Sequence, residues 1–413
     1  MRKSAVVLIL MKASSDYTLT FPEKIDWERY SAYRPDVPFS DEVIDFLNAL
    51  SGALMKDGMS RLYPDVVTFA YFCRRANLLK LREQYVREGE LRLGRGMLFH
   101  IAPSNVPVNF AYSLVAGLLA GNANIVRISS KPFPQVNLIT NQLYKLRESG
   151  LHDDVAERIV LLRYDRSSDA GAFLSSICSV RIIWGGDDTI QTVRRHPIPP
   201  RSFDVCFADR YSVAVIRPSA ILTATGAEIE RLAVQFYNDT YLFDQNACSS
   251  PHTIFWLEDG QSVVDAKERF WSAVHKLAVN KYQLQAVMSV DKLTAFYRQA
   301  VGVNVRKTDM PDNVVVRSEL LELPEGTDRY RCSCGYFSEK TIASIDEIAP
   351  VVSIKYQTLS HYGFHESELR DFIIRNRLTG FDRIVPIGET TAFSLTWDGC
   401  NLIDTLSRTV TVR

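Results

Sequence analysis

From residue 96 onward, short apolar runs alternate with longer segments that have the spacing of amphipathic helices. The apolar runs are MLFHIA, NIVRIS, RIVLLRY and SVRIIWGG. Strands that are apolar along almost their whole length are buried on both faces, as parallel strands are when helices cover each side of the sheet. The alternation therefore predicts an α/β architecture built on a parallel sheet.

A second series of the same kind begins with YSVAVIRP at residues 211–218. It continues through the strand-like run HTIFWLE, a long helical segment from Val263 to about Val279, and a further strand-like run, APVVSIKYQTL. A chain of 413 residues is longer than one hydrophobic core usually serves. We therefore predict two α/β domains, the second of which starts near residue 212.

The charge balance argues against nucleic acid as a partner. The chain has 48 Lys and Arg and 48 Asp and Glu, so its formal net charge is zero, and no basic stripe carries interleaved aromatic residues. Its 7 cysteines are an odd number scattered through a long chain, which is typical of free thiols in a reducing compartment. We therefore expect a cytoplasmic protein.

The N-terminal run MRKSAVVLILMKASS has two basic residues before an apolar stretch, as a signal peptide does. Lys12 interrupts this stretch before it reaches the length of a signal-peptide core, so we expect a short strand or an irregular start instead. Elsewhere the sequence does not approach the ~18 uninterrupted apolar residues that a membrane span needs. We expect no membrane span.

Cys248 lies in the polar segment DQNACSS, residues 244–250. A structural cysteine usually packs among apolar side chains, whereas a reacting thiolate needs a polar and partly exposed position. The alternative is a buried thiol that only fills space, which is the commoner role of an arbitrary cysteine. The polar neighbours make Cys248 a candidate nucleophile.

Asn105 lies where a predicted strand gives way to a predicted helix, in HIAPSNVPVNF. Pro107 has a φ suited to a first helical turn, and Asn105 can be the N-cap of this helix. The side-chain amide of an asparagine at such a turn can also donate a hydrogen bond to a developing oxyanion, and loss of that contact typically costs about 3 kcal/mol. Both interpretations are open at this point.

Two further strand ends carry groups that suit phosphates. The segment IVRISSKPFP places Arg127, Ser129 and Ser130 at the carboxyl end of a strand, where ligands bind in open α/β sheets. The segment IIWGGDDTI places Gly185 and Gly186 between a strand and a helix, where the backbone can approach a pyrophosphate. The first segment could instead be a solvated loop, and the Asp pair of the second could simply cap the helix. No G-x-G-x-x-G occurs at a strand-to-helix turn, so the ordinary dinucleotide fingerprint is absent.

The remaining motifs give little support to metal or hydrolase chemistry. Cys332 and Cys334 form a C-x-C without a second cysteine pair or well-spaced histidines. His361 and His365 are four residues apart, but a glycine lies between them and no H-E-x-x-H occurs. The G-x-S-x-G of serine hydrolases is also absent from the sequence. We predict no metal site.

In their order along the chain, these motifs resemble the aldehyde dehydrogenase superfamily, and more closely the acyl-CoA reductase family typified by the fatty acid reductase of bacterial bioluminescence. The resemblance extends from about residue 90 to the C-terminus. Its blocks are HIAPSNVPVNFAYSLVAGLLAGNANIVRIS, DQNACSSP, YQTLSHYG and DRIVPIGETTAFSLTWDGCNLIDTLSR.

The resemblance implies an aldehyde-dehydrogenase-like fold with a Rossmann-like, NADP(H)-binding domain over residues 1–211 and a second α/β domain, which holds the catalytic cysteine, over residues 212–385. Residues 386–413 are expected to return to the cofactor side and to end in an oligomerisation strand that extends a neighbour's sheet. We therefore expect a homodimer, although this strand could instead pair within its own chain.

By the same resemblance, Cys248 matches the catalytic nucleophile, and Asn105 matches the asparagine that forms the oxyanion hole with the Cys248 backbone N–H. Gly185, followed by Gly186, matches the glycine of the nucleotide-binding turn. Hydrolytic members place a general-base glutamate upstream of the cysteine, and the corresponding DVCFADRYSVAVI contains none, which suits a thioester reductase. The luminescence-type enzymes often have a histidine in this region, where the chain has Asp209, so the group that activates Cys248 is not identified.

The resemblance also bears on the cofactor. Arg127 falls where the superfamily commonly has a lysine near the adenosine ribose, and Ser129 and Ser130 cover the position at which NAD-specific members often carry a glutamate. Without that carboxylate a 2′-phosphate could fit, so the resemblance implies NADPH. Glu347, in DEIAPVV, matches the glutamate that holds the nicotinamide ribose if a gap is allowed.

The expected activity is NADPH-dependent reduction of an acyl-CoA, or of an acyl chain delivered by a partner acyl-protein synthetase, to an aldehyde through a thioester on Cys248. Three alternatives stay open. The same fold could run oxidatively as a CoA-acylating aldehyde dehydrogenase, it could be a non-catalytic structural subunit, or the protein could be a cysteine hydrolase.

Overall fold

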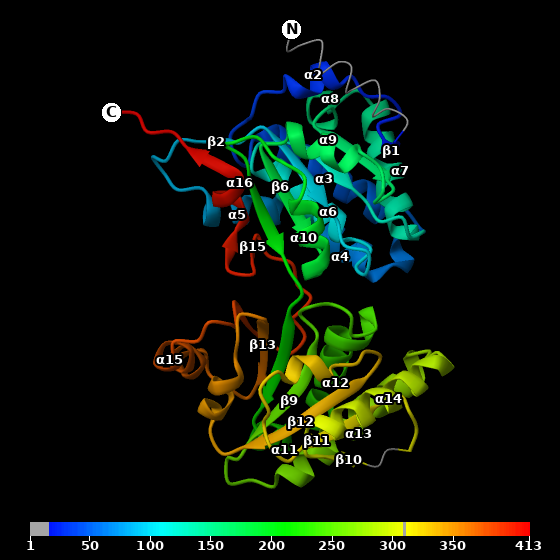
Figure 1. Cartoon of the computed structure of the whole chain (residues 1–413), viewed down its shortest axis with the longest axis vertical. Helices are drawn as coiled ribbons and strands as arrows, with labels where there is room; N and C mark the ends of the chain where they lie inside the picture. Colours follow the sequence, from blue (N-terminus) through cyan, green and yellow to red (C-terminus); the bar gives the residue numbers. More distant parts are fainter. Residues whose placement is uncertain (1–15, 309–310) are drawn as a thin grey trace. The chain divides into compact units, whose positions relative to one another are not determined.

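The computed structural model describes residues 16–308 and 311–413 (Figure 1). These residues group into two compact units: the first contains the chain up to Ala208 together with Leu395–Arg413, and the second consists of Asp209–Ser394. Residues 386–394, which the sequence assigned to the C-terminal segment, group with the second unit. The apolar run near the N-terminus, for which a short strand was expected, lies outside the described residues.

The first unit is built on a six-stranded sheet. Its strands, in spatial order, are β1 (Tyr17–Phe21), β5 (Ile159–Tyr164), β4 (Ala123–Arg127), β3 (Met97–Ile101), β6 (Val180–Trp184) and β7 (Phe203–Phe207). Strand β1 runs antiparallel to β5, and the other strands are parallel. The parallel sheet that the apolar runs predicted is confirmed.

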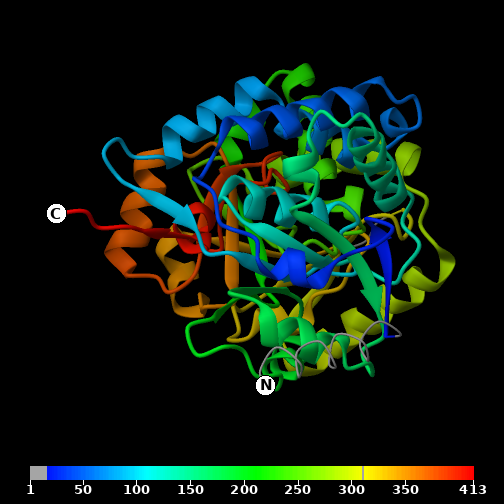
Figure 2. The ribbon, with the colours of Figure 1, turned by 90° about the horizontal axis from the view of Figure 1, so that it is seen from above.

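Helices cover both faces of this sheet (Figure 2). Phe99 and Ile125 belong to a core on one face, together with residues of α2 (Trp27–Ser31), α9 (Ala170–Ile177) and α10 (Asp187–Arg194). Leu98 points the opposite way, because side chains alternate along a strand, and it lies against Gly117 of α6 (Asn109–Leu119). Strands buried on both faces explain why the sequence shows continuous apolar runs rather than alternation.

The strand order reverses next to β3. From β3 the chain continues to β4 and β5 on one side, and later to β6 and β7 on the other. In open α/β sheets, ligands bind outside the carboxyl ends of the strands at such a reversal. The loops that follow β3, β4 and β6 therefore form the edge of the first unit that is best suited to a ligand.

The second unit contains a seven-stranded sheet. Its strands, in spatial order, are β10 (Val305–Thr308), β11 (Val316–Leu320), β12 (Tyr336–Ile342), β9 (Pro251–Leu257), β8 (Tyr211–Ile216), β13 (Tyr356–Tyr362) and β14 (Arg383–Pro386). Only the pairing of β10 with β11 is antiparallel among the described strands of this sheet. The prediction of a second α/β unit is confirmed.

This second sheet is also covered on both faces. One apolar core joins it to α11 (Pro218–Thr223), α12 (Gly226–Thr240) and α13 (Val263–Lys281). Another core joins it to η4 (Ile345–Val351) and α15 (Glu366–Asn376). A further helix, α14 (Ala286–Gly302), precedes β10 and is labelled in Figure 1.

The strand predicted over APVVSIKYQTL is wrong in its first half. Residues 345–351 form the 3-10 helix η4, and β13 begins only at Tyr356. At the start of η4, Ser344 Oγ accepts a hydrogen bond from the backbone N–H of Asp346, and Glu347 Oε1 accepts one from the N–H of Ser344. Local bonds of this kind compete with strand pairing, which a count of apolar residues does not detect.

The C-terminal strand pairs within its own chain. Strand β17 (Ser407–Thr409) runs antiparallel to β2 (Arg92–Gly94), and Asn122 Nδ2 donates to the carbonyl of Leu406 at 3.0 Å. The structure therefore shows the intramolecular pairing that the sequence left open, and the expected homodimer stays a prediction. Across residues 16–308 and 311–413, every helix is too short or too polar to cross a membrane.

Candidate active site

Cys248 lies at the amino edge of the second sheet. It precedes β9 by three residues, and it is bonded to the second residue of β8 and to the second residue of β13. The loop enters this position through Asp244 and Gln245, which both adopt the left-handed conformation with φ of 52° and 59°. Non-glycine residues with positive φ are uncommon, so the surroundings must hold this loop in place.

The buried side chain of Gln245 holds the loop. Its Nε2 donates to the carbonyls of Pro251 and Tyr336, at 3.0 Å each, and its Oε1 accepts from the backbone N–H groups of Gly335 and Tyr336 at 3.0 and 3.2 Å. A single amide thus satisfies four backbone groups at the starts of β9 and β12. In the sequence this residue is only a polar neighbour of Cys248, and nothing there indicates this role.

Two side chains bind Cys248 directly. Ser212 Oγ donates to the Cys248 carbonyl at 2.7 Å and accepts from the backbone N–H of Thr358 at 3.1 Å. Gln357 Nε2 donates to Cys248 Sγ at 3.3 Å, while Cys248 itself stays only partly buried. An N–H donor aimed at sulfur favours the charged thiolate. Gln357 lies in the YQTLSHYG block, but its role could not be found from the sequence because the two residues are 109 positions apart.

Asp209, which lies two residues before β8, and His252, the second residue of β9, are engaged elsewhere. Both Oδ atoms of Asp209 accept from Arg331 Nη2 at 2.7 Å. His252 is buried and stacked on Tyr211, and burial lowers the pKa of His252 to about 3. Its Nδ1 lies 3.1 Å from the Cys332 carbonyl, which can only accept, so this nitrogen carries the proton.

The C-x-C motif supports the nucleophile loop from the other side. The backbone N–H of Cys334 donates to the Asp244 carbonyl at 3.0 Å, and Cys334 is itself buried with φ of 59°. Within the described part of the chain, no cluster of His, Cys, Asp and Glu could hold a metal ion. The motif is part of the frame around Cys248.

Asn105 lies in the turn between β3 and α6 and is exposed within the first unit. The interpretation as an N-cap is wrong, because α6 begins at Asn109 and its N-cap is Val108. The backbone forms an extra turn first, in which the N–H of Asn109 donates to the Val106 carbonyl. Asn105 therefore follows β3 at the edge that the topology favours for a ligand.

The residues predicted to bind an adenosine phosphate lie beyond the next strand. Arg127 is the last residue of β4, and its guanidinium lies over the Tyr164 ring at 5.2 Å. Ser129 is buried and accepts from the backbone N–H of Lys131, whereas Ser130 is exposed. These residues share the carboxyl edge with Asn105, since β3 and β4 are parallel neighbours.

The glycine turn lies at the same edge, after β6. Gly186 is the N-cap of α10, and Asp187 and Asp188 form the first turn of that helix. A Cβ added to Gly185 would lie 3.1 Å from Thr189 Cγ2, so the turn is packed closely on its helix and keeps a bare backbone. The structure thus brings the loops of Asn105, Arg127 and Gly185 to one edge of the first sheet.

Glu347, the last predicted site residue, belongs to the second unit. Its Oε1 accepts from the backbone N–H groups of Ala343 and Ser344 at 2.8 and 3.1 Å, which makes it the capping residue of η4. This local role is sufficient to explain its position. Its assignment to the nicotinamide ribose stays a prediction.

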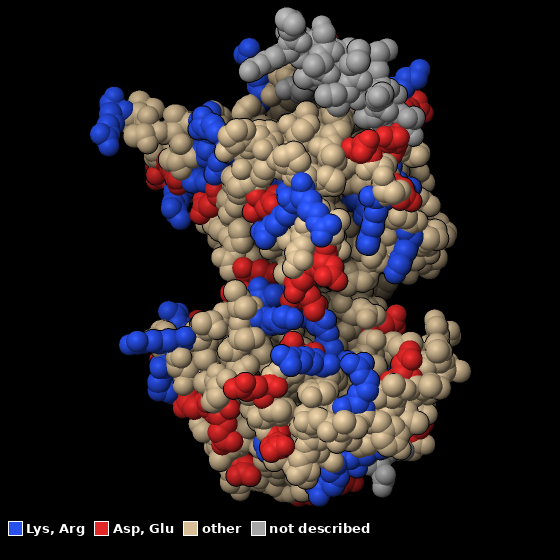
Figure 3. Space-filling model, in the orientation of Figure 1, with Lys and Arg blue, Asp and Glu red and all other residues tan. Residues whose placement is uncertain are grey.

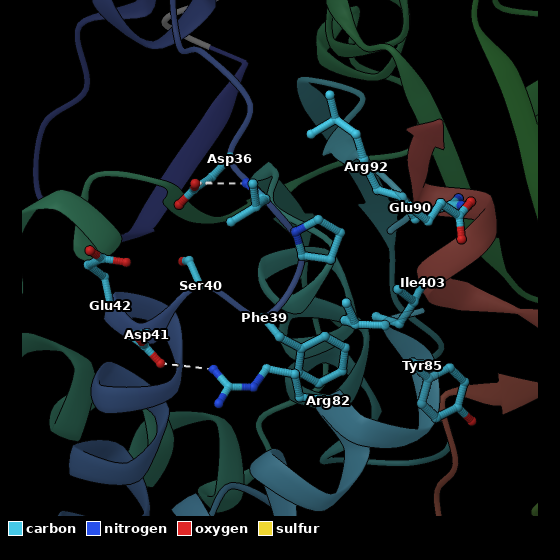
Figure 4. A pocket seen from close by; sticks show the side chains of 14 residues that line it. Asp36, Phe39, Ser40, Asp41, Glu42, Arg82, Tyr85, Glu90, Arg92 and Ile403 are labelled. Atoms are coloured by element: carbon cyan, nitrogen blue, oxygen red, sulfur yellow. Dashed lines mark hydrogen bonds and ion pairs between the residues drawn. The ribbon is translucent and has the colours of Figure 1, made fainter. Parts of the chain in front are cut away.

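A separate hollow of about 650 Å³ lies in the first unit (Figure 4). Its lining includes Asp41, Arg82, Glu90 and Arg92, and none of the predicted site residues. The charged groups pair with one another, with Arg82 at 3.0 Å from Asp41 and Arg92 at 2.7 Å from Glu90. The hollow is therefore distinct from the candidate active site.

Comparison with known proteins decides the family. Residues 75–409 match the family described as acyl-CoA reductase (LuxC). The chain belongs to this family. Among curated relatives of this LuxC-family chain are the long-chain acyl-protein thioester reductases of Aliivibrio fischeri, 22% identical over 307 residues, and of Vibrio harveyi, 24% identical over 328 residues.

These matches cover 72% and 76% of the LuxC-family chain, but only 60% and 63% of the two relatives. A third, long-chain acyl-protein thioester reductase 2 of Photobacterium leiognathi, is 24% identical over 43% of this chain and 36% of its own length. The chain therefore spans less than two thirds of the relatives that it matches.

Solved structures agree on the fold. Aldehyde dehydrogenase 21 from Physcomitrella patens has a TM-score of 0.64 at 10% identity, covering 93% of this chain and 86% of its own. Lactaldehyde dehydrogenase from Escherichia coli has a TM-score of 0.62 at 12% identity, covering 93% and 88%. The aldehyde-dehydrogenase-like fold expected from the sequence is confirmed.

Proposed function

We propose that the chain is an oxidoreductase that converts an acyl thioester to an aldehyde through a thioester on Cys248, with NADPH as the reductant. The observation that carries this proposal is the setting of the thiol: a partly buried sulfur that accepts an amide N–H, in a loop held by a buried glutamine. Membership of the LuxC family supports the same reaction class.

In the first half-reaction, Cys248 Sγ forms a bond to the acyl carbonyl carbon, and the bond from that carbon to the sulfur of the donor breaks. The proton of the Cys248 thiol leaves with the donor thiol. Gln357 Nε2 stabilises the sulfur while it carries negative charge, and a hydrogen bond to a charged group contributes about 1.5–3 kcal/mol. Gln357 supplies the activation that the sequence left unexplained.

Each half-reaction passes through a tetrahedral oxyanion. We assign its stabilisation to the backbone N–H of Cys248 and to the side-chain amide of Asn105. Ser212 fixes the Cys248 peptide through the carbonyl, so the orientation of the loop backbone is set before the substrate arrives. Removing one such donor typically lowers the rate about 100-fold.

The carboxyl edge of the first sheet fits the proposed cofactor. The bare Gly185–Gly186 turn at the start of α10 suits a pyrophosphate, and the cation of Arg127 with exposed Ser130 suits a 2′-phosphate that a carboxylate would repel. When bound, the nicotinamide supplies a hydride for the acyl carbon. The aldehyde then leaves as the Cys248 sulfur takes back a proton. One solved relative by fold, 1-pyrroline-5-carboxylate dehydrogenase from Thermus, has bound NAD.

The engaged states of Asp209 and His252 favour a reductase over a hydrolase. A hydrolase needs a base that activates water against the acyl-enzyme. Asp209 is held by Arg331, and burial lowers the pKa of His252 to about 3, which makes this imidazole a weak base. A thioester reductase needs no such base.

For the acyl donor we propose a long acyl chain on CoA or on a protein thiol, because the relatives are named long-chain acyl-protein thioester reductases. For a protein-bound donor, an acyl-protein synthetase is the partner that we expect to load it. The cytoplasmic location expected from the free thiols belongs to the same proposal.

The first test is acylation without the reductant. Incubation with acyl-CoA alone should add one acyl mass to the chain, and peptide mapping should place it on Cys248. Cys248→Ala should show no adduct, whereas Cys400→Ala, which removes another partly buried free thiol, should acylate as the wild type does. The proposal fails if the wild type gains no acyl mass, or if Cys248→Ala gains as much.

The second test separates the alternatives. With NADPH and acyl-CoA, the wild type should consume NADPH and release aldehyde, and Asn105→Ala should do so about 100-fold more slowly. Faster turnover of aldehyde, CoA and NADP would indicate the oxidative enzyme. Free acid formed without cofactor would indicate a hydrolase, and an absence of NADPH binding would indicate a structural subunit.

A further inference from the structure

The two faces of helix α14 have the reverse of the usual polarity. The residues that it buries most fully are Lys292 and Gln299. Met288, Ala295 and Phe296 are half-buried, whereas the other apolar side chains of the helix are exposed. The exposed fractions of the outward residues are 58% for Val287, 63% for Val290, 45% for Leu293, 61% for Tyr297 and 91% for Val301. A surface helix normally turns its apolar stripe to the core, so an outward stripe of this length indicates an interaction surface.

The buried face of α14 is fixed to the second unit by polar contacts. Lys292 Nζ donates to the Asn313 carbonyl at 2.7 Å, and Gln299 is bonded to the Ser338 and Tyr336 side chains at 3.0 and 2.6 Å. The helix therefore keeps its place without help from the outward stripe. Substitutions on that stripe are expected to leave the fold intact.

The outward residues follow the spacing of a coiled-coil seam. Val287, Thr294 and Val301 fall at position a of successive heptads, and Val290 and Tyr297 fall at position d. The central polar residue does not prevent burial, because Thr294 Oγ1 donates to the Val290 carbonyl at 2.9 Å within its own helix. The stripe can therefore be covered by another helix without leaving a hydroxyl unpaired.

The charges beside the seam select the partner and its direction. Asp291 and Arg298 are both exposed and both occupy position e. Side chains of one helix pair when they are three or four residues apart, and these two are seven residues apart, so they do not pair with each other within the helix. In an antiparallel pair of helices, position e faces position e, whereas in a parallel pair it faces position g, which here holds alanine or leucine.

We propose that a second copy of this chain docks on α14, with the two α14 helices antiparallel about a two-fold axis near Thr294. In this arrangement Asp291 of each copy lies opposite Arg298 of the other, so the pair occurs twice, as an isologous interface requires. It also brings Val287 of each copy towards Val301 of the other. A helix of 17 residues is about 25 Å long and buries a modest area, so the dimer is expected to dissociate on dilution.

This surface is separate from the C-terminal strand β17, whose pairing with β2 leaves its expected part in a homodimer a prediction. Helix α14 is the yellow-green helix at the right of the second unit in Figure 1. In Figure 3 the right side of the same unit is largely tan, the colour of residues other than Lys, Arg, Asp and Glu. The inference concerns assembly and does not depend on the proposed reductase activity.

The first experiment is sedimentation velocity of the full chain from nanomolar to high micromolar concentration. The wild type should pass from monomer to dimer. Val290→Asp and Tyr297→Asp each put two charges into the seam and should raise the dissociation constant at least about tenfold. Val264→Asp, at a residue of α13 that is 72% exposed, is the matched control and should dimerise as the wild type does.

The second experiment tests the direction of the helices. Asp291→Arg should weaken the dimer, because it places arginine opposite arginine, and the double variant Asp291→Arg, Arg298→Asp should restore it. Circular dichroism should show the same helix content in all variants. A wild type that stays monomeric, a dimer unaffected by Val290→Asp, or a charge exchange without recovery would each overturn the proposal.

Discussion

The two sheets carry their candidate groups at opposite edges. In the first unit, Asn105, Arg127 and Gly185 lie in or next to the loops that follow parallel strands, where the strand order reverses. In the second unit, Cys248 lies in a loop that precedes a strand. The rule that ligands bind at the carboxyl edge of a parallel sheet therefore applies to the candidate residues of the first unit, but it does not predict the position of Cys248.

The difference matches the two proposed tasks, cofactor binding and nucleophilic attack. A cofactor edge needs bare backbone and exposed polar groups, such as Gly186 and Ser130, so that a ligand can approach. A nucleophile needs a fixed direction, which Gln245 provides with four bonds to backbone groups. Each candidate binding residue can be recognised from the strand that it follows in the sequence, whereas the contacts that hold Cys248 in place come from distant strands.

The largest expected effect comes from removing the buried amide of the second sheet. Gln245→Ala leaves four backbone groups without their partner and places alanine at positive φ, so the free energy of unfolding should fall by about 4 kcal/mol. Thermal and urea unfolding would measure it, with exposed Gln283→Ala as the control. A loss below about 1 kcal/mol would mean that Gln245 does not hold the nucleophile loop.

Both sheets bury a neutral histidine, and this shared feature gives the next effect. Burial lowers the pKa of His252 to about 3 and that of His100 to about 4. In the unfolded chain the imidazole of His252 has its ordinary pKa near 6.5, so the unfolded chain binds a proton below that pH while the folded chain does not. The contribution of His252 to the free energy of unfolding is therefore fully present above pH 6.5, and about 3 kcal/mol of it is lost at pH 4.

The measurement is urea unfolding of the wild type and His252→Gln at a series of pH values. Burial raises the pKa of Asp239 to about 6. Protonation of this carboxyl therefore raises the free energy of unfolding as pH falls from about 6 to 4, opposite to the effect of His252. Both proteins contain Asp239, so its effect is the same in the two curves. The difference between the two curves therefore isolates His252. Parallel curves from pH 7 to pH 4 would count against a buried neutral imidazole.

A smaller effect is expected at the edge of the first sheet that we propose for the cofactor. Ser130→Glu places a carboxylate on an exposed position beyond β4, so the dissociation constant of NADPH should rise about tenfold while that of NADH changes little. Fluorescence titration would measure both, and Ser149→Glu, exposed at the end of α7 (Pro134–Glu148), is the control. Equal weakening of both cofactors would argue against a 2′-phosphate at this position.

The smallest effect is expected at Glu347. Glu347→Ala removes a capping acceptor and should lower the free energy of unfolding by about 1 kcal/mol, while Glu347→Gln should recover most of this loss. The KM for NADPH should stay the same in the glutamine variant if capping is its whole role. A raised KM would instead support the ribose contact that the resemblance implies.

The sequence was a good guide where structure follows local pattern. Both parallel sheets could be predicted from apolar runs, and the candidate nucleophile Cys248 from its polar neighbours. The pattern was wrong at residues 349–355, where η4 with its local capping box ends before β13 begins, and at the start of α6, where an additional turn precedes the helix. Gln357 was beyond reach, since its contact with Cys248 exists only once β13 lies beside β8.

The first unit is made from two separated stretches of chain, and this affects the order in which the protein can be completed. Leu402, Ile403 and Leu406 are almost fully buried in that unit, and the carbonyl of Leu406 binds Asn122. On the ribosome, the second unit is fully synthesised before these residues emerge. The first unit therefore keeps part of its apolar surface uncovered until these residues have been made, and we expect newly made chains to need protection from aggregation up to that moment.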